Sequence, residues 1–154
     1  MTKFLLSVHV IAAIVAIGPV TVAASMFPRT ARAAVTGDRP ARATARTLYR
    51  ICRVYAAVGI AVPAFGLATA ISMGVLGDAW VLVSIALTAV AAAVLIAAVL
   101  PDQQKVLTAL DSTTPAVDLG ARISRIAMTG GVFNLLWATV TVLMIIRPGS
   151  TTGA

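Results

Sequence analysis

Four stretches of this chain contain no Asp, Glu, Lys or Arg, and each is long enough to cross a lipid bilayer as a helix. They cover residues 4–26, 54–76, 80–100 and 126–146. A helix that crosses the hydrocarbon core needs about 20 apolar residues, and it bonds its own backbone groups internally, as the absence of water requires. The sequence therefore predicts an all-α fold, a polytopic membrane four-helix bundle that forms one transmembrane domain over residues 1–154.

The charged residues are too few for a surface that faces water. They make up 11% of the chain, against 60% hydrophobic residues, and the mean hydropathy is +0.99. Soluble domains carry about 25% charged residues. A net charge of +7 would suggest nucleic acid in a soluble protein, but seven of the twelve basic residues lie between Arg29 and Arg53 in one inter-helix region. That placement favours the anionic headgroups of a bilayer as the partner and argues against nucleic acid.

The distribution of Lys and Arg predicts the orientation of the bundle. Ten of them lie in the two segments 27–53 and 101–125, and two, Lys3 and Arg147, lie on the other side. Basic residues are retained in the cytoplasm, so both segments are expected to be cytoplasmic loops and both termini to be outside (N-out/C-out). An alanine- and arginine-rich chain without glutamate is typical of a high-GC bacterial genome, which indicates a bacterial cytoplasmic (inner) membrane.

Several local features refine this topology. The first apolar run is longer than the 7–15 residues of a signal-peptide core, so we expect a retained helix, bent at Gly18-Pro19. The stretch Ala41–Tyr55 is expected to extend the second span as a helix. Its spacings of four and three place four arginines on one face, toward lipid headgroups or a partner: Arg42, Arg46, Arg50 and Arg53. Pro101-Asp102 is expected to end the third span, and residues 102–122 to form a polar loop with a short helical piece at 106–112.

The remaining connections and contacts follow from turn residues and small residues. Gly77-Asp78 predicts a tight turn between the second and third spans, with Trp80 as an interfacial anchor. Gly130-Gly131 in the fourth span and the alanines of the third span allow close helix packing. Asn134 lies near the middle of the fourth span, where its amide is expected to find a hydrogen-bonding partner on another helix.

His9 is the one histidine of the chain and lies inside the first predicted span. An ionisable residue in a membrane span is a functional hypothesis by default. Met73 and Met144 lie near the same end of their spans, and a histidine with a thioether can ligate haem iron or reduced copper. The alternative is a structural histidine that bonds a backbone carbonyl or a hydroxyl group of a neighbouring helix. We expect no cofactor, with haem b as the possible exception.

The sequence offers little else for catalysis or transport. No span carries Asp, Glu, Lys or Arg near its centre, which disfavours a proton relay or an ion-coupled transporter. Phosphate-binding and hydrolase motifs are missing, and the lone Cys52 allows no thiolate metal cluster. No catalytic residue is therefore predicted, and the chain is expected not to be an enzyme by itself.

Two stretches resemble known bacterial membrane proteins. Leu5–Gly18 (LLSVHVIAAIVAIG) is similar to the first helix of proteins related to the CopD and HemJ group, which has a histidine a few residues in and a glycine about two turns later. Phe133–Gly149 (FNLLWATVTVLMIIRPG) resembles the last helix of an uncharacterised, predicted four-helix family in the same grouping. The resemblance implies the four-span topology and points to His9. The further histidines and the membrane lysine of the metal- or haem-handling relatives are missing here.

Three functions remain open from the sequence. The first is a non-catalytic accessory or assembly subunit of a larger membrane complex, with a respiratory oxidase or supercomplex as one host, or a self-associating protein. The second is a haem- or copper-handling membrane protein that uses His9. The third is a small transporter, which the uncharged span centres disfavour.

Overall fold

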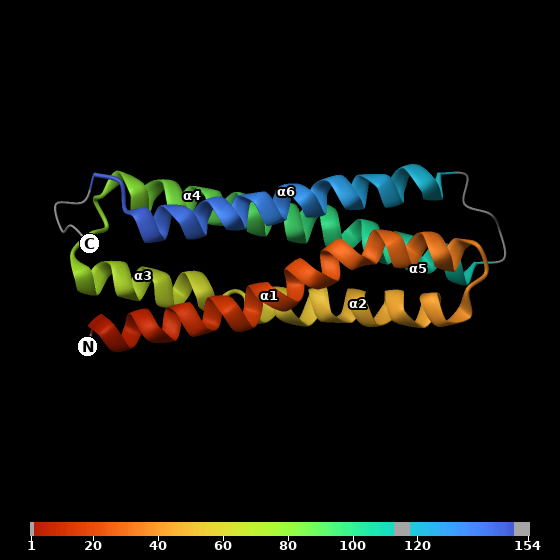
Figure 1. The fold of residues 1–154 in the computed structure, drawn as a ribbon, viewed down its shortest axis with the longest axis horizontal. Helices are drawn as coiled ribbons and strands as arrows, with labels where there is room; N and C mark the ends of the chain where they lie inside the picture. Colours follow the sequence, from red (N-terminus) through yellow and green to blue (C-terminus); the bar gives the residue numbers. More distant parts are fainter. Residues whose placement is uncertain (1, 113–117, 150–154) are drawn as a thin grey trace.

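A computed structural model describes residues 2–112 and 118–149, and these residues form helices and short turns without a strand. Helix α1 (Thr2–Val35) is followed by α2 (Arg39–Val58) and α3 (Ala61–Met73). The chain continues through α4 (Ala79–Val94), the π-helical segment η1 (Leu95–Val99) and α5 (Leu100–Asp111), and ends with α6 (Leu119–Ile146). Together they form one elongated bundle (Figure 1).

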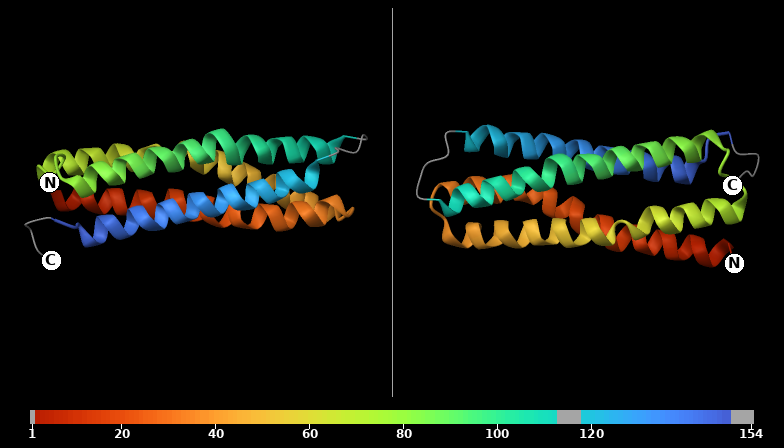
Figure 2. Two further views of the ribbon diagram at one scale, coloured as in Figure 1. Left: turned by 90° about the horizontal axis from the view of Figure 1, so that it is seen from above. Right: turned by 180° about the vertical axis from the view of Figure 1, so that it is seen from behind.

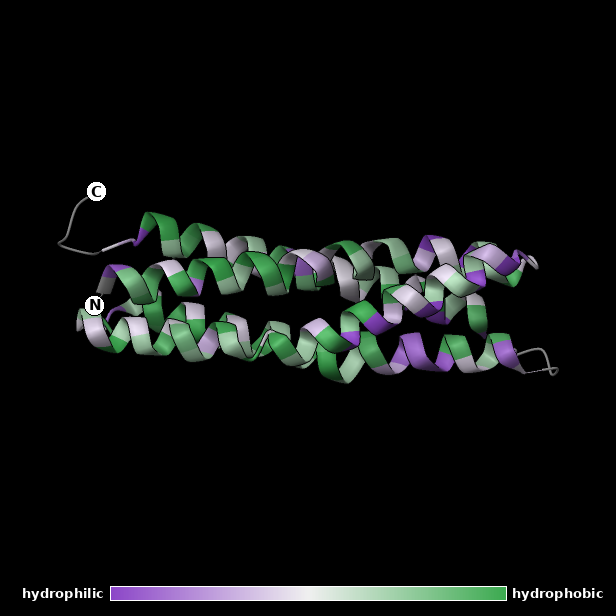
Figure 3. Cartoon of the chain, turned by 90° about the horizontal axis from the view of Figure 1, so that it is seen from below, coloured by the Kyte–Doolittle hydropathy of each residue, from purple (hydrophilic) through white to green (hydrophobic). Residues whose placement is uncertain are grey.

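Four helices of the bundle are long and apolar enough to cross a membrane, as the sequence predicts. They are Lys3–Val35, Arg39–Met73, Ala79–Asp111 and Leu119–Ile146, so α2 with α3, and α4 with η1 and α5, each act as one long helix. The N-terminus, the α3–α4 turn and the end of α6 lie at one end of the bundle (Figures 1 and 2). Hydrophilic residues gather toward the opposite end (Figure 3), which we call the polar end.

The helices extend well beyond the predicted spans. Within the segments predicted as loops, 27–53 and 101–125, the described residues are almost entirely helical, and only Thr36–Asp38 and Ser112 with Asp118 lie outside helices. Residues 113–117 lie outside the described part. With 34 residues, α1 is about 51 Å long at 1.5 Å per residue, against about 30 Å of hydrocarbon core. The four-helix bundle therefore continues past the apolar spans at the polar end.

The third long helix does not end at Pro101, where the third span was expected to end, because a π-helical segment carries the helix through the proline. Pro101 has no backbone N–H and cannot donate to the carbonyl of the preceding turn. Just before it, the N–H of Leu100 donates to the oxygen of Leu95, five residues back. This wider turn shifts the hydrogen-bond register before the proline, which then occupies the first turn of α5, where a missing N–H leaves no intrahelical bond broken.

Pro63 has a comparable effect between α2 and α3. The helix is interrupted at Gly59 and Ile60, four and three residues before the proline, and the freed oxygen of Gly59 accepts from the N–H of Val62 at 3.1 Å. In α1 the helix continues through both Pro19 and Pro28. Pro28 leaves the Ala24 oxygen without its helical donor, and Gly130 of α6 packs against that carbonyl. The predicted close approach therefore occurs at Gly130.

Packing is uneven along the bundle. The main cluster of buried apolar side chains runs from Val20 toward the polar end of α1 and includes Phe27, Ile126 and Phe133 together with the facing residues of α2 and α5. The four helix segments at the other end, from the N-terminal half of α1, α3, the first half of α4 and the last turns of α6, border a cavity instead. The bundle is thus solid at the polar end and hollow at the end near the termini, where the cavity is partly open and lining side chains such as Ile14 and Ile145 are exposed.

Candidate functional site

The cavity at the hollow end has a volume of about 1560 Å³. Ligand pockets commonly measure about 300–1,000 Å³, so it is large for a chain of 154 residues. Side chains from α1, α3, α4 and α6 line it, and apolar groups dominate its wall. The cavity lies between the four predicted membrane spans, where hydrocarbon is the surrounding solvent.

His9 projects from α1 to the wall of this cavity and is 8% exposed. Its Nδ1 lies 2.9 Å from the backbone oxygen of Val62 in α3. A carbonyl oxygen can only accept, so Nδ1 carries the proton and donates, and in the uncharged ring Nε2 is an acceptor. Among the described residues Nε2 has no hydrogen-bonding partner. The geometry therefore contains the structural hydrogen bond expected for His9 and also leaves one ring nitrogen open.

Gly66 makes room for the histidine. A Cβ at this position would lie 2.8 Å from His9 Cε1, closer than real Cβ contacts, so a larger residue would displace the ring. Gly66 lies one helical turn after Val62, and the same short segment of α3 both accepts the hydrogen bond and accommodates the imidazole. The sequence gives no signal that pairs His9 with Gly66, because 57 residues separate them.

The two methionines predicted to accompany His9 border the same cavity. Met73 comes from the last turn of α3 and Met144 from the end of α6. In the described part of the chain, no three His, Cys, Asp or Glu side chains converge into a metal-binding group. A metal or haem iron in this cavity would therefore depend on His9 Nε2 and on thioether sulfur.

Trp137 of α6 also lines the cavity, and its indole nitrogen Nε1 is buried without a hydrogen-bonding partner among the described residues. The edge of Phe133 packs against its ring, with centroids 6.3 Å apart. This contact fixes the indole at the boundary between the packed core and the hollow end. Buried donors almost always find a partner in folded proteins, so this N–H, which neighbouring protein atoms cover, is an exception.

Polar and aromatic residues from two helix ends meet where the cavity reaches the end near the termini. Trp80 Nε1 donates to Asp78 Oδ2 at 3.1 Å, and the guanidinium of Arg147 lies 5.8 Å from the centroid of the Trp80 ring. This cation–π contact links the start of α4 to the end of α6. It gives Trp80, the predicted interfacial anchor, a partner within the chain.

Asn134 lies outside the cavity and contacts α1. Its Nδ2 donates to Ser25 Oγ at 2.9 Å, while Oδ1 is buried without a partner among the described residues. Ser25 in turn donates to the oxygen of Thr21. The amide therefore links the middle of α6 to a point about two-thirds of the way along α1, the kind of interhelical contact that the sequence predicts for it.

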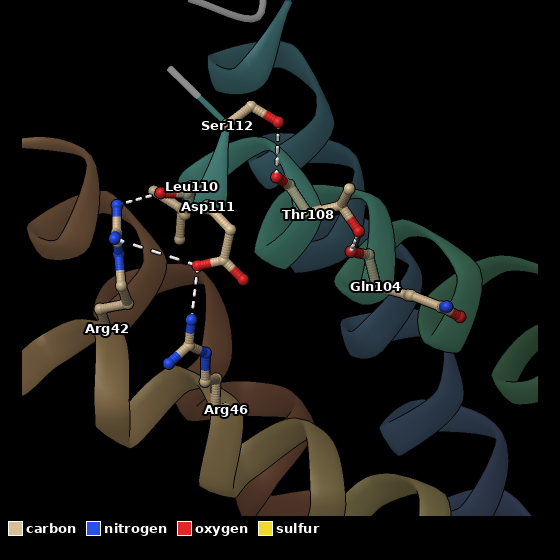
Figure 4. Close-up of polar contacts among 7 residues, drawn as sticks. All are labelled: Arg42, Arg46, Gln104, Thr108, Leu110, Asp111 and Ser112. Atoms are coloured by element: carbon tan, nitrogen blue, oxygen red, sulfur yellow. Dashed lines mark hydrogen bonds and ion pairs between the residues drawn. The ribbon is translucent and has the colours of Figure 1, made fainter. Parts of the chain in front are cut away.

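The four arginines predicted to share one helix face lie on α2, which is helical as expected: Arg42, Arg46, Arg50 and Arg53. The helix begins after Asp38, whose side chain accepts a hydrogen bond from the N–H of Ala41 at 3.0 Å. Arg42 donates to the backbone oxygen of Leu110, and Arg46 lies 2.5 Å from Asp111 Oδ1 (Figure 4). These cations neutralise the C-terminal end of α5, where the helix dipole favours positive charge. Arg50 and Arg53 are exposed and lie next to the predicted span.

Asp102 forms the one deeply buried ionic contact that the described residues provide, and sequence reasoning missed it. Its side chain is 2% exposed, with Arg122 Nη1 3.1 Å from Oδ1 and Arg125 Nε 2.9 Å from Oδ2. The Arg125 contact is an ion pair without an aligned hydrogen bond, since Oδ2 has no hydrogen-bonding partner of good geometry. The pairing fastens α5 to the start of α6. The sequence contains the aspartate and the two arginines, but it does not indicate that they pair across the connection between α5 and α6.

A buried polar contact links α2 to α5 beside this ion pair. Gln103 Nε2 donates to Cys52 Sγ at 3.7 Å, and both side chains are fully buried. Burial raises the pKa of the Cys52 thiol, and the hydrogen bond from Gln103 opposes that shift in part. The thiol is therefore uncharged at neutral pH and fills space between two helices.

Comparisons with family models, with curated proteins and with solved structures gave no match to this chain. The resemblance of its first and last helices to the CopD and HemJ group therefore stays a prediction.

The buried ion pair predicts a stability difference between two aspartates. Asp102→Asn should lower the free energy of unfolding by about 1–3 kcal/mol, because a buried group loses charge-assisted bonds. Asp111→Asn should cost less than about 1 kcal/mol, because its arginines are half-exposed and screened. Thermal unfolding of both variants in one detergent measures the difference, and an equal loss in the two would contradict the assigned role of Asp102.

Proposed function

We propose that this chain is a non-catalytic accessory or assembly subunit that associates with other membrane-spanning chains, or with itself. The observation that carries the proposal is an outward face of the third long helix. Its residues recur at spacings of four and three, are exposed, and are mostly alanine: Ala86, Val90, Ala93 and Ala97. Small residues let two helix backbones approach closely, which is the main route to helix association in lipid.

The same helix presents a different face to the cavity. Val81, Ile85 and Ala89 line the cavity, whereas Ala93 and Ala97 do not. A partner helix could therefore pack on the outer face without entering the bundle. A larger respiratory complex, such as an oxidase or supercomplex, is one host that fits a small apolar subunit of this kind.

The proposed orientation is N-out/C-out in a bacterial cytoplasmic membrane. The excess of ten basic residues over two supports it, and hydrophilic residues gather toward the polar end of the bundle (Figure 3). Arg42 precedes the predicted second span by twelve residues, about 18 Å of helix, and it bonds within the chain. Arg50 and Arg53 lie at the level expected for headgroups, so these two are the proposed contacts with anionic lipid.

A second candidate function is haem or copper handling at His9. It is favoured by the hydrogen bond from His9 Nδ1 to the Val62 oxygen, since metal-binding histidines commonly donate their other ring N–H to a carbonyl or carboxylate. The shared cavity of His9, Met73 and Met144 adds to it. In this case Nε2 would face the metal, with a thioether as the possible second ligand.

The orientation predicts which engineered cysteines react from outside. In a Cys52→Ala background, Gly77→Cys should be labelled on intact cells by a membrane-impermeant maleimide. Thr36→Cys should be labelled only after the membrane is permeabilised, because Thr36 lies in the α1–α2 turn at the polar end. Labelling of Thr36→Cys on intact cells would contradict the N-out/C-out arrangement.

The outer face of the third long helix predicts a loss of association. Ala93→Leu should weaken the affinity for a partner helix by about tenfold, which corresponds to about 1.4 kcal/mol of lost packing. The measurement is co-purification of a partner from native membranes in mild detergent or, for a homo-oligomer, the shift toward the monomer. The matched control is Ala138→Leu, an exposed alanine on α6. Equal effects of the two substitutions, or none, would argue against this face as the contact.

Haem or copper handling predicts bound cofactor on the purified chain. Protein from haem-replete, copper-replete cells should then show a Soret band or copper by metal analysis. His9→Gln should abolish that signal, and Met73→Leu or Met144→Leu should alter it. Met128→Leu is the control, since Met128 is exposed and lies outside the cavity. A signal that survives His9→Gln would exclude His9 as the ligand.

A further inference from the structure

The hollow end of the bundle has the properties of a binding site in its own right. A volume of about 1560 Å³ exceeds that of a typical small-molecule pocket. The wall includes no Asp, Glu or Lys from the described residues, and its one guanidinium, that of Arg147, stacks near Trp80 and bonds the oxygen of Met144. A molecule that fills this space must be apolar over most of its surface and needs no net charge.

One polar atom on the wall restricts the occupant further. His9 Nε2 is an acceptor in the uncharged ring, because Nδ1 already donates to Val62. Trp137 Nε1 is covered by neighbouring protein atoms, so it offers no donor to the cavity. The complementary molecule therefore offers a hydroxyl hydrogen to His9.

We propose that this cavity binds an uncharged, lipid-soluble molecule that carries a hydroxyl group. The hydroxyl donates to His9 Nε2, and the apolar remainder of the molecule lies against α1, α3 and α4. A membrane hydroquinone with an isoprenoid tail and a diacylglycerol both have this chemistry. The site is separate from the proposed association face, because other residues of the third long helix line it.

The hydrogen-bond pattern predicts a preference for ligands with a hydroxyl group, which a purely apolar cavity would lack. A hydroquinone donates O–H, whereas the quinone of the same carbon skeleton has acceptors only. The full-length protein in phosphatidylcholine nanodiscs is titrated anaerobically with decylubiquinol and with decylubiquinone, and binding is measured by calorimetry. Decylubiquinol should bind about three- to tenfold more tightly, the equivalent of one hydrogen bond. A second pair, dioleoylglycerol and its acetyl ester, tests the lipid source in the same way.

Variants connect the preference to His9. His9→Phe should remove the preference for the hydroxylated member of a pair. Because His9→Phe also removes the bond to α3, a second test leaves His9 in place. Ala89→Phe fills the cavity from α4 and should abolish binding, and Ala138→Phe, exposed on α6 and outside the cavity lining, should not.

The outcomes separate clearly. A hydroxyl preference in the quinol pair alone identifies a hydroquinone class of ligand, and one in the glycerolipid pair alone identifies a diacylglycerol class. The proposal is overturned if neither pair shows saturable binding, as expected for a cavity filled by phospholipid chains or water. It is also overturned if the two members of each pair bind equally to the wild-type protein, or if Ala89→Phe and Ala138→Phe act alike.

Discussion

In hydrocarbon no water can form a hydrogen bond with a backbone N–H or C=O group that lacks its partner within the helix. This constraint governs the shape of the bundle. Four prolines lie inside long helices and each removes a donor. The chain compensates differently at each of three sites. A π-helical segment precedes Pro101, a short interruption precedes Pro63, and a glycine of α6 packs against the carbonyl that Pro28 leaves free. These adjustments redirect helices without exposing backbone to lipid.

The two ends of the bundle differ in how they are held together. At the polar end, α5 is fastened to α6 through Asp102 and to α2 through Asp111 and Gln103, and large apolar side chains fill the remaining space. At the hollow end, single contacts join the helices, chiefly His9 to Val62 and Arg147 to Trp80. Rigid packing at one end allows an open cavity at the other, because the four helices are already positioned relative to one another.

Hydropathy and charge gave the number of helices and their approximate positions, since both are local properties of the sequence. Helix lengths were underestimated because charged residues and prolines look like loop signals. In the structure, α1 continues through Pro28 to Val35, and the third long helix continues through Pro101 after a π turn. Residue type alone also singled out His9 and Asn134. Their partners, Val62 and Ser25, could not be predicted, because pairing between distant segments depends on the rotation and height of each helix.

The cavity was the least predictable feature, and its origin lies in residue size as much as in helix arrangement. Glycine and alanine line it where α1, α3 and α4 face each other, at Gly18, Gly66 and Ala89 among others. Such residues in a membrane helix usually bring backbones together, as Gly130 does against Ala24. On α3, by contrast, the space beside Gly66 is occupied by the ring of His9, which keeps α1 and α3 joined by a side chain instead of by backbone contact. A small-residue pattern is therefore ambiguous by itself. Whether it closes a helix interface or opens room for an imidazole and a ligand depends on the one polar side chain placed opposite.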